Sequence, residues 1–298
     1  FQEPFARLFT QGMITHPAYR CPEHGWIAPQ QVREGRCPTG GEELEVSLQK
    51  MAKSKLNVVA PSAIIERFGA DTERVFTLFV APPEKESEWS DEGVRGASRF
   101  LTRVWRLVVG TAERLQGSDQ ASVVERAGSG EEVDAELARR THRAIKKVTE
   151  DLGTAFHFNT AIAALMEFSN HLGGYVEHTA RSAWNEVGLC RALTTLVILL
   201  HPFAPHITEE MWRVLGGDDS LLRQPWPDWD ETALATDEIS LVVTVNGKVR
   251  SKIRVPPGTG EADLRAAALA DEKITRILAG KEPRKVIVVP DRLVNLVL

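Results

Sequence analysis

The residues best suited to chemistry on an anion are three lysines that fall within six positions of this 298-residue chain. They stand in the stretch Lys50-Met51-Ala52-Lys53-Ser54-Lys55. On a loop in front of a helix, such ammonium groups can surround a triphosphate and neutralise negative charge that develops on it. The alternative is a solvated basic run, because lysine-rich loops are common on protein surfaces. Spacing alone favours this alternative.

A second group of residues consists of soft metal ligands. Cys21, His24 and Cys37 offer two thiolates and an imidazole, and His16 is a candidate for a fourth ligand. Structural zinc sites are normally closed sets of four ligands in paired short spacings, and Cys37 lacks such a partner in the sequence. We therefore predict a loop without zinc and no metal-binding residue in the chain.

A third group, His201, His206 and Glu209, flanks prolines at expected helix ends. A packed, hydrogen-bonded histidine is commoner there than a ligand or an acid–base group, so we predict structural roles. Cys190 lies on an apolar helix face and is expected in the core. Three scattered cysteines are too few for a disulfide framework, which indicates a reducing compartment.

The C-terminal segment is cationic although the whole chain has a formal net charge of −5. From Ser240 onward the formal charge is +5, against −10 for the residues before it. A cationic module on an acidic chain indicates a polyanionic partner.

A β-hairpin is predicted at the start of this segment, because apolar residues alternate on both sides of the turn signal Asn246-Gly247. Side chains alternate between the two faces of a strand. The pattern therefore predicts that Val249, Ile253 and Val255 point to the core. The opposite, exposed face of the return strand would then carry four cations, Lys248, Arg250, Lys252 and Arg254.

Several elements must position these residues. Apolar residues at alternating steps of three and four predict amphipathic helices. Proline, glycine and capping residues set the expected bounds. Five helices are expected at residues 61–68, near 133–152, and at 179–200, 207–215 and 261–278, the last with a break at Asp271. Three more are expected from their caps: one capped by Asp71 that ends before Pro82, one that follows the cap Ser90, and one capped by Asn159.

The predicted fold class is multidomain and mainly α. An antiparallel helical bundle is expected to follow a loop-rich segment that carries the lysine stretch, because long helices joined by short polar links form such bundles. A linker rich in acids, prolines and tryptophans, with Trp226 and Trp229 pinned to the bundle, leads to a small α+β unit of ββαββ order.

The lysine stretch resembles the K-M-S-K-S signature loop of class I aminoacyl-tRNA synthetases, and its surroundings resemble the bacterial-type leucyl branch. The joint match of loop, bundle and tail is specific. The segments that carry the leucyl likeness are residues 9–13 (FTQGM), 57–59 (NVV), 68–72 (FGADT), 88–90 (EWS), 201–212 (HPFAPHITEEMW), 245–250 (VNGKVR) and 289–295 (VPDRLVN).

The resemblance implies a domain plan. Residues 1–80 correspond to the end of a catalytic domain, with a leucine-specific insertion at about 14–48 and the signature loop at 50–54. Residues 81–217 correspond to a helical anticodon-binding domain, 218–239 to a linker and 240–298 to a C-terminal tRNA-binding domain. The four cations of the return strand are then expected to contact tRNA.

The resemblance also implies an activity. Members of the family form an aminoacyl-adenylate from leucine and ATP, with Mg²⁺ accompanying ATP, and pass the aminoacyl group to leucine tRNA. Lys53 and Lys50 correspond to the lysines assigned to the ATP phosphates, and Met51 and Ser54 complete the ATP-binding loop. Ala52 departs from the usual serine, which removes a hydroxyl but leaves the charge unchanged.

The chain shows no H-I-G-H-type motif, nucleotide-binding parallel sheet or threonine-rich editing segment. We therefore expect a C-terminal piece of a cytoplasmic, monomeric enzyme, inactive alone, with no bound cofactor and no membrane partner. One alternative is a tRNA-binding appendage that never belonged to an enzyme. Another is the isoleucyl or valyl relative, and a third is a purely structural fragment with a disordered loop.

Overall fold

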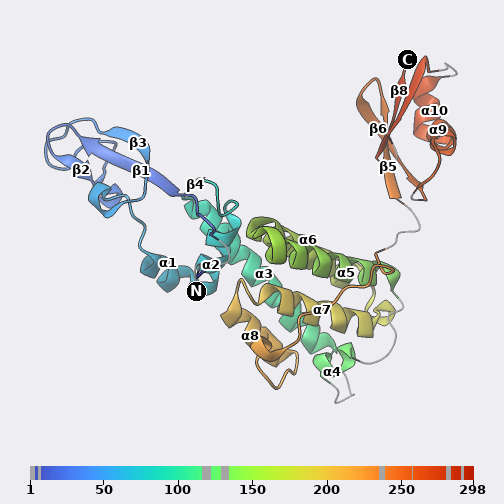
Figure 1. The fold of residues 1–298 in the computed structure, drawn as a ribbon, viewed down its shortest axis with the longest axis horizontal. Coiled ribbons are helices and arrows are strands. Elements are labelled where there is room, and N and C mark those ends of the chain that lie inside the picture. Colours follow the sequence, from blue (N-terminus) through green and yellow to red (C-terminus); the bar gives the residue numbers. More distant parts are fainter. Residues whose placement is uncertain are drawn as a thin grey trace. The chain divides into compact units, whose positions relative to one another are not determined.

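The computed structural model describes residues 4–5, 8–115, 122–128, 134–234, 239–256, 258–279, 283–289 and 292–298. The chain divides into two compact units, Phe1–Ala233 and Leu234–Leu298 (Figure 1). The division falls inside the stretch 218–239 that the sequence assigns to a linker. Among the described residues, none of the helices has the length and apolar character needed to cross a bilayer.

The first unit begins with a small sheet in the order β2-β1-β3. Its antiparallel strands are β1 (Ile14–Cys21), β2 (Gly25–Ile27) and β3 (Glu45–Lys50). The two-residue β4 (Ser87–Glu88) pairs in parallel with the start of β1. Because β3 ends at Lys50, this sheet sets the position at which the lysine stretch begins.

Two short helices follow the lysine stretch. As predicted, α1 (Pro61–Phe68) begins at a proline, whose missing N–H is unneeded in a first turn, and ends at Gly69 with φ of 85°. The second helix, α2 (Ala70–Phe79), ends before the predicted Pro82. Its N-cap residue is Gly69, so the prediction that Asp71 caps this helix is wrong.

The buried carboxylate of Asp71 instead caps a helix far away in the sequence, α8 (Pro205–Val214). It accepts hydrogen bonds from the backbone amides of Ile207 at 2.6 Å and His206 at 3.3 Å, and His206 Nδ1 lies 2.8 Å away. Arg74, one turn later on α2, donates to two carbonyl oxygens of the turn before α8. Sequence reasoning cannot see a cap supplied by another helix.

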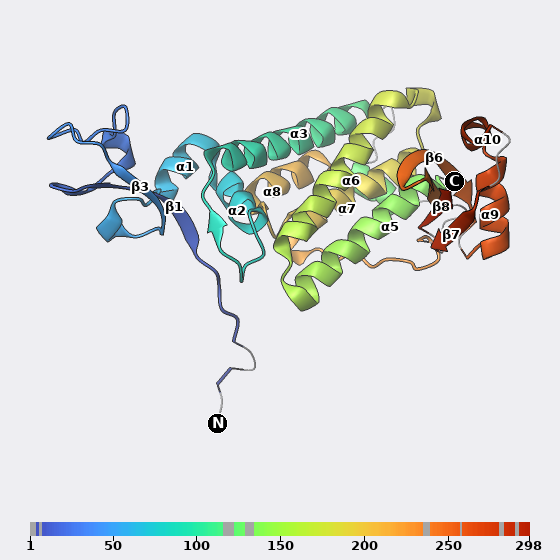
Figure 2. The same cartoon turned by 90° about the horizontal axis from the view of Figure 1, so that it is seen from above.

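Long helices form the main core of the first unit. They are α3 (Asp91–Leu115), α5 (Ala135–Glu150), α6 (Phe158–His178) and α7 (Glu186–Leu200), with the short α4 (Val123–Ala127) packed on α7. Figure 2 shows α5, α6 and α7 side by side. Only residues 151–157 separate α5 from α6, so these two packed helices run in opposite directions.

The predicted apolar stripes lie in this core. Val94, Val104 and Val108 of α3 are fully buried, as are Leu165 of α6 and Leu193 of α7. Aliphatic burial of this kind contributes roughly 1.5–3 kcal/mol per side chain.

Two helix starts differ from the prediction. His157, not Asn159, precedes α6, and the helix predicted from residue 179 begins only at Glu186, after a 3₁₀ turn. The Asn185 side chain accepts from the Gly188 amide and caps α7. The start of α7 is therefore set by the Asn185 cap and not by the apolar periodicity that extends back to residue 179.

The second unit has the predicted ββαββ order. It contains β5 (Ile239–Val245), β6 (Lys248–Val255), α9 (Glu261–Ala270), α10 (Glu272–Leu278), β7 (Lys285–Val289) and β8 (Leu293–Val297). The sheet order is β6-β5-β8-β7, which makes β6 an edge strand. Asp271 breaks the helical stretch and caps α10. Residues 290 and 291, which belong to the leucyl-like segment 289–295, lie outside the described residues.

We predict that Asp71→Ala lowers the free energy of unfolding by about 1–3 kcal/mol, because it removes a helix cap and leaves two amides in the first turn of α8 without their acceptor. Urea unfolding of the chain followed by circular dichroism measures this. Glu66→Ala, at an exposed position of α1, is the matched control and should change stability little. Equal stability of the two variants would show that the cap contributes nothing.

Candidate functional site

The lysine stretch leaves the end of β3 and closes in a single 3₁₀ turn, Lys53–Lys55. The Met51 amide donates to the Ile14 carbonyl at 3.0 Å, which keeps the start of the loop against β1. The side chains of Lys50 and Lys53 are exposed. Within the part of the chain that the structure describes, no hydrogen bond or ion pair engages their ammonium groups.

Asn57 fixes the backbone of this loop. Its side chain is fully buried, and its Oδ1 accepts from the Ala52 amide at 3.0 Å. Its Nδ2 donates to the carbonyl oxygens of His16 at 3.1 Å and Gln49 at 3.2 Å, with that of Lys50 at 3.5 Å. One carboxamide thus joins β1, β3 and the loop. In the sequence, Asn57 is noted only as part of segment 57–59, which resembles the leucyl family, and its role in fixing the loop was not predicted.

Lys55 differs from the other two lysines because its charge is already engaged. Its Nζ donates to Gln49 Oε1 at 2.7 Å and lies 5.9 Å from the centre of the Trp26 ring, within cation–π range. Lys50 and Lys53 are therefore the two cations of the loop that can turn to an anionic ligand.

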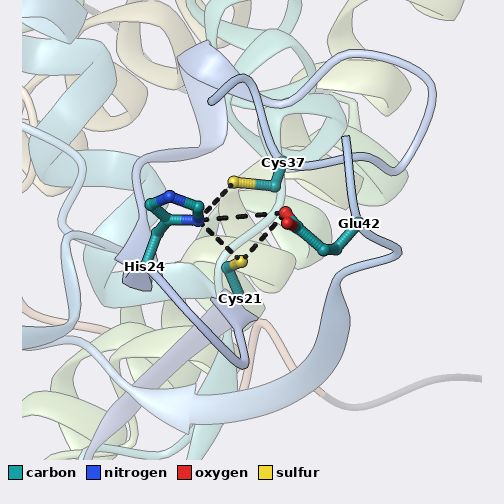
Figure 3. A group of neighbouring side chains, drawn as sticks. All are labelled: Cys21, His24, Cys37 and Glu42. Carbon is teal, nitrogen blue, oxygen red and sulfur yellow. Dashed lines mark hydrogen bonds and ion pairs between the residues drawn. The ribbon is translucent and has the colours of Figure 1, made fainter. Parts of the chain in front are cut away.

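A second cluster lies at the far end of the same small sheet (Figure 3). The ligand atoms of Cys21, His24, Cys37 and Glu42 all lie within 4.8 Å of one another. His16 is not among them, since its Nδ1 lies 3.1 Å from the Asn57 carbonyl oxygen. The sequence-based argument that Cys37 has no partner does not hold, because Glu42 completes the set. The signal that could have indicated this partner is Gly40-Gly41, because two glycines between Cys37 and Glu42 allow a turn that brings the Glu42 carboxylate next to Cys37.

His201, His206 and Glu209 have structural partners, as predicted. His201 Nδ1 lies 2.8 Å from the Thr208 hydroxyl, and burial lowers the pKa of this imidazole. His206 contacts Asp71, and Glu209 accepts from the Ser220 hydroxyl at 2.6 Å. Cys190 is fully buried in the bundle core. Of the linker tryptophans, Trp226 donates to the Thr149 hydroxyl of α5 and Trp229 packs against the core, which confirms that they pin the linker.

The basic strand β6 carries all four cations in exposed positions. However, a register shift between Val243 and Thr244 places Thr244 opposite Val249 and Val245 opposite Lys248. The alternation is interrupted there, and Val249 is 61% exposed, so the prediction that it points to the core is wrong. The bulge also contradicts the prediction of one shared face.

The face of three of the four cations follows from this register, because residues opposite each other share a face of the sheet, whereas Arg250 lies at the shift and has no opposite residue. Lys252 and Arg254 stand opposite Val242 and Ser240, whereas Lys248 stands on the face of Val245. The cations of β6 therefore do not all lie on one face of the sheet.

Comparison with known proteins gives a consistent picture. Residues 134–265 match the family described as the anticodon-binding domain of tRNA ligase. The chain is 44% identical to the leucine–tRNA ligase of Desulfatibacillum aliphaticivorans and 46% identical to that of Synechococcus sp. (strain WH7803). These matches cover 100% and 99% of the chain but only 35% and 34% of the relatives. The chain thus spans about a third of their length.

A solved structure is also similar over the whole chain. It is the agnB2 LeuRS of Agrobacterium radiobacter K84, determined as a ternary complex with tRNA and LeuAMS. The TM-score is 0.66 and the sequence identity 30%, with 100% of this chain and 34% of that chain covered.

We predict that Asn57→Ala frees the lysine loop without unfolding the bundle, because it leaves the Ala52 amide without its acceptor, at about 1–3 kcal/mol. Hydrogen–deuterium exchange measured by mass spectrometry should show faster exchange over residues 50–57. Asn170→Ala, at an exposed position of α6, is the control. Unchanged protection of the loop would contradict the assigned role of Asn57.

Proposed function

The chain belongs to the leucine–tRNA ligase family, and we propose that it supplies such an enzyme with its ATP-contacting loop and with surfaces for leucine tRNA. The observation that carries this proposal is the loop at 50–55, whose backbone is fixed by Asn57 and whose Lys50 and Lys53 ammonium groups have no partner among the described residues. A loop fixed in this way presents charge to a ligand without the entropy cost of ordering its backbone.

In the proposed reaction, the leucine carboxylate attacks the α-phosphorus of ATP. Pyrophosphate leaves with Mg²⁺, and leucyl-adenylate forms. A hydroxyl of the terminal ribose of leucine tRNA then attacks the leucyl carbonyl carbon, and AMP leaves. Negative charge grows on the departing pyrophosphate in the first step, and we assign Lys53 and Lys50 to stabilise it. Met51, Ala52 and Ser54 complete the contact with ATP.

The proposed enzyme acts in the cytoplasm as a monomer. All three cysteines are free, which is the state expected of a reducing compartment. We do not expect the 298-residue chain alone to activate leucine, because the resemblance assigns the H-I-G-H motif to another part of the enzyme.

The competing function is a tRNA-binding appendage with no part in catalysis. A pure binding module has no need of an ATP-contacting signature loop, which the stretch at 50–55 resembles. The isoleucyl and valyl relatives are disfavoured by residues 88–90 and the basic hairpin. Leucine-dependent exchange of pyrophosphate into ATP, measured on a longer protein that contains this chain, separates these functions.

We predict that Lys53→Ala slows adenylate formation roughly a hundredfold, about 3 kcal/mol, in a leucine–tRNA ligase that contains this chain. Affinity for tRNA should change little, since the lost charge acts on phosphates of ATP. Stopped-flow adenylation and pyrophosphate exchange measure the rate. Lys50→Ala should be milder, and Ala52→Ser near neutral. Lys55→Ala is the matched control, because Lys55 is engaged by Gln49. An unchanged rate for the Lys53 variant would remove it from the site.

We propose further that β6 contacts tRNA phosphates. The strand is an edge of its sheet, and its four cations are exposed. Charges on an edge strand also prevent pairing with other sheets, which is the structural explanation that a binding experiment must exclude. Neutralising phosphates releases counterions, so a true contact changes the salt dependence of binding.

We predict that Arg250→Ala/Lys252→Ala weakens binding of leucine tRNA at every salt concentration. It should also flatten the plot of log affinity against log salt by about two contacts. Filter binding of the 298-residue chain over a salt series measures both quantities. The control is Arg265→Ala/Lys273→Ala, which removes the same charge from exposed positions of α9 and α10. If the β6 variant keeps the original slope, the strand is only solvated.

A further inference from the structure

Four side chains that are suitable as zinc ligands converge at the end of the small N-terminal sheet (Figure 3). Cys21 ends β1, His24 lies in the turn before β2, and Cys37 and Glu42 come from the loop before β3. We propose that these four residues bind one structural Zn²⁺ ion. This inference is independent of the proposed catalytic role of the lysine loop.

The distances between the ligand atoms fit one ion. His24 Nδ1 lies 3.4 Å from Cys21 Sγ, 3.6 Å from Cys37 Sγ and 3.8 Å from Glu42 Oε2. Cys21 Sγ lies 3.5 Å from Glu42 Oε2. Tetrahedral Zn²⁺, with bonds of about 2.3 Å to sulfur and about 2.0–2.2 Å to nitrogen or oxygen, separates its ligand atoms by roughly 3.4–3.8 Å. The side chains need only small shifts to coordinate the ion.

The backbone holds each pair of ligands in place. Cys21 pairs with Gly25 across the β1–β2 turn, and Gly25 has φ of 74°, which brings His24 beside Cys21. On the other side, the Cys37 amide donates to the Glu42 carbonyl oxygen at 2.8 Å. The ligands are therefore arranged before any ion binds, which lowers the entropy cost of coordination.

The identity of the metal follows from the ligands. Two thiolates and an imidazole favour zinc over the harder Mg²⁺ and Ca²⁺, which prefer oxygen ligands. All four positions of a tetrahedron are filled by protein. The site therefore leaves no place for a reacting water, and its role is structural.

The sheet also needs such a stabilising element. Among the described residues, its cluster of buried apolar side chains consists of Cys21, Ile27, Cys37 and Leu44, with Tyr19 and Val32 partly buried against it. On β3, Val46 and Leu48 are 58% and 56% exposed. Small units with so little core are commonly held together by a disulfide or a structural metal. Zinc would fix the end of the sheet opposite to the lysine loop.

Metal analysis of the full 298-residue chain tests the proposal. Chain purified without chelators should contain about one Zn²⁺. After replacement by Co²⁺, it should show the visible bands of tetrahedral cobalt and a near-ultraviolet thiolate-to-metal charge-transfer band.

Variants test the ligand assignment. Cys37→Ser and Glu42→Gln should weaken Co²⁺ binding by more than the roughly 10–100-fold that outer-shell partners typically contribute. The matched controls are Cys190→Ala in the bundle core and Glu43→Gln, the exposed neighbour of Glu42, and both should bind as the original chain does.

A variant that gains signal is needed as well, because removing a ligand could abolish metal binding simply by unfolding the sheet. Glu42→Cys should retain the ion and raise the charge-transfer absorbance per cobalt in the proportion of three thiolates to two. This readout cannot arise from a purely structural role of the carboxylate.

Several results would overturn the proposal. One is a chain without zinc that gives no tetrahedral cobalt spectrum. Another is a Cys21–Cys37 disulfide, found by thiol titration of the denatured, unreduced chain. A third is metal that the Cys37 and Glu42 variants bind as tightly as the controls do, which would place the ion elsewhere.

Discussion

Backbone groups that no helix or strand can pair are the constraint on which the arrangement of the first unit depends. A buried amide or carbonyl without a partner is costly, so buried polar side chains must reach these groups. Asn57 does this for the turn that leaves β3, and Asp71 does it for the first turn of α8. Each joins segments that are remote in the sequence, and each therefore fixes a relative position as well as a hydrogen bond.

The small sheet is consequently held at both ends by polar contacts and hardly at all by an apolar core. At one end Asn57 joins β1, β3 and the lysine loop, and at the other four ligand atoms meet within 4.8 Å. This division separates two tasks. The ligand cluster secures the fold of the strands, and the carboxamide sets the backbone from which Lys50 and Lys53 extend into solvent.

Much of the fold followed from local patterns in the sequence. The bounds of α1 follow from Pro61 and Gly69, and the hairpin of the second unit follows from Asn246-Gly247. The apolar stripes of the bundle were likewise correct, because apolar residues at helical spacing fall on one side of the helix and that side packs against the core. The lysine loop was found from its residue types and its likeness to a known family.

What the sequence by itself determined was thus the type and order of the elements and the residues that could meet phosphate, because propensity, periodicity and turn chemistry act over a few positions. Tertiary structure alone decided that Asp71 caps α8, that Glu42 joins Cys21 and Cys37, and that a bulge turns Val249 outward. Each of these outcomes depends on a partner distant in the chain. Local patterns cannot specify such partners, since the distance between them is set only when the core packs.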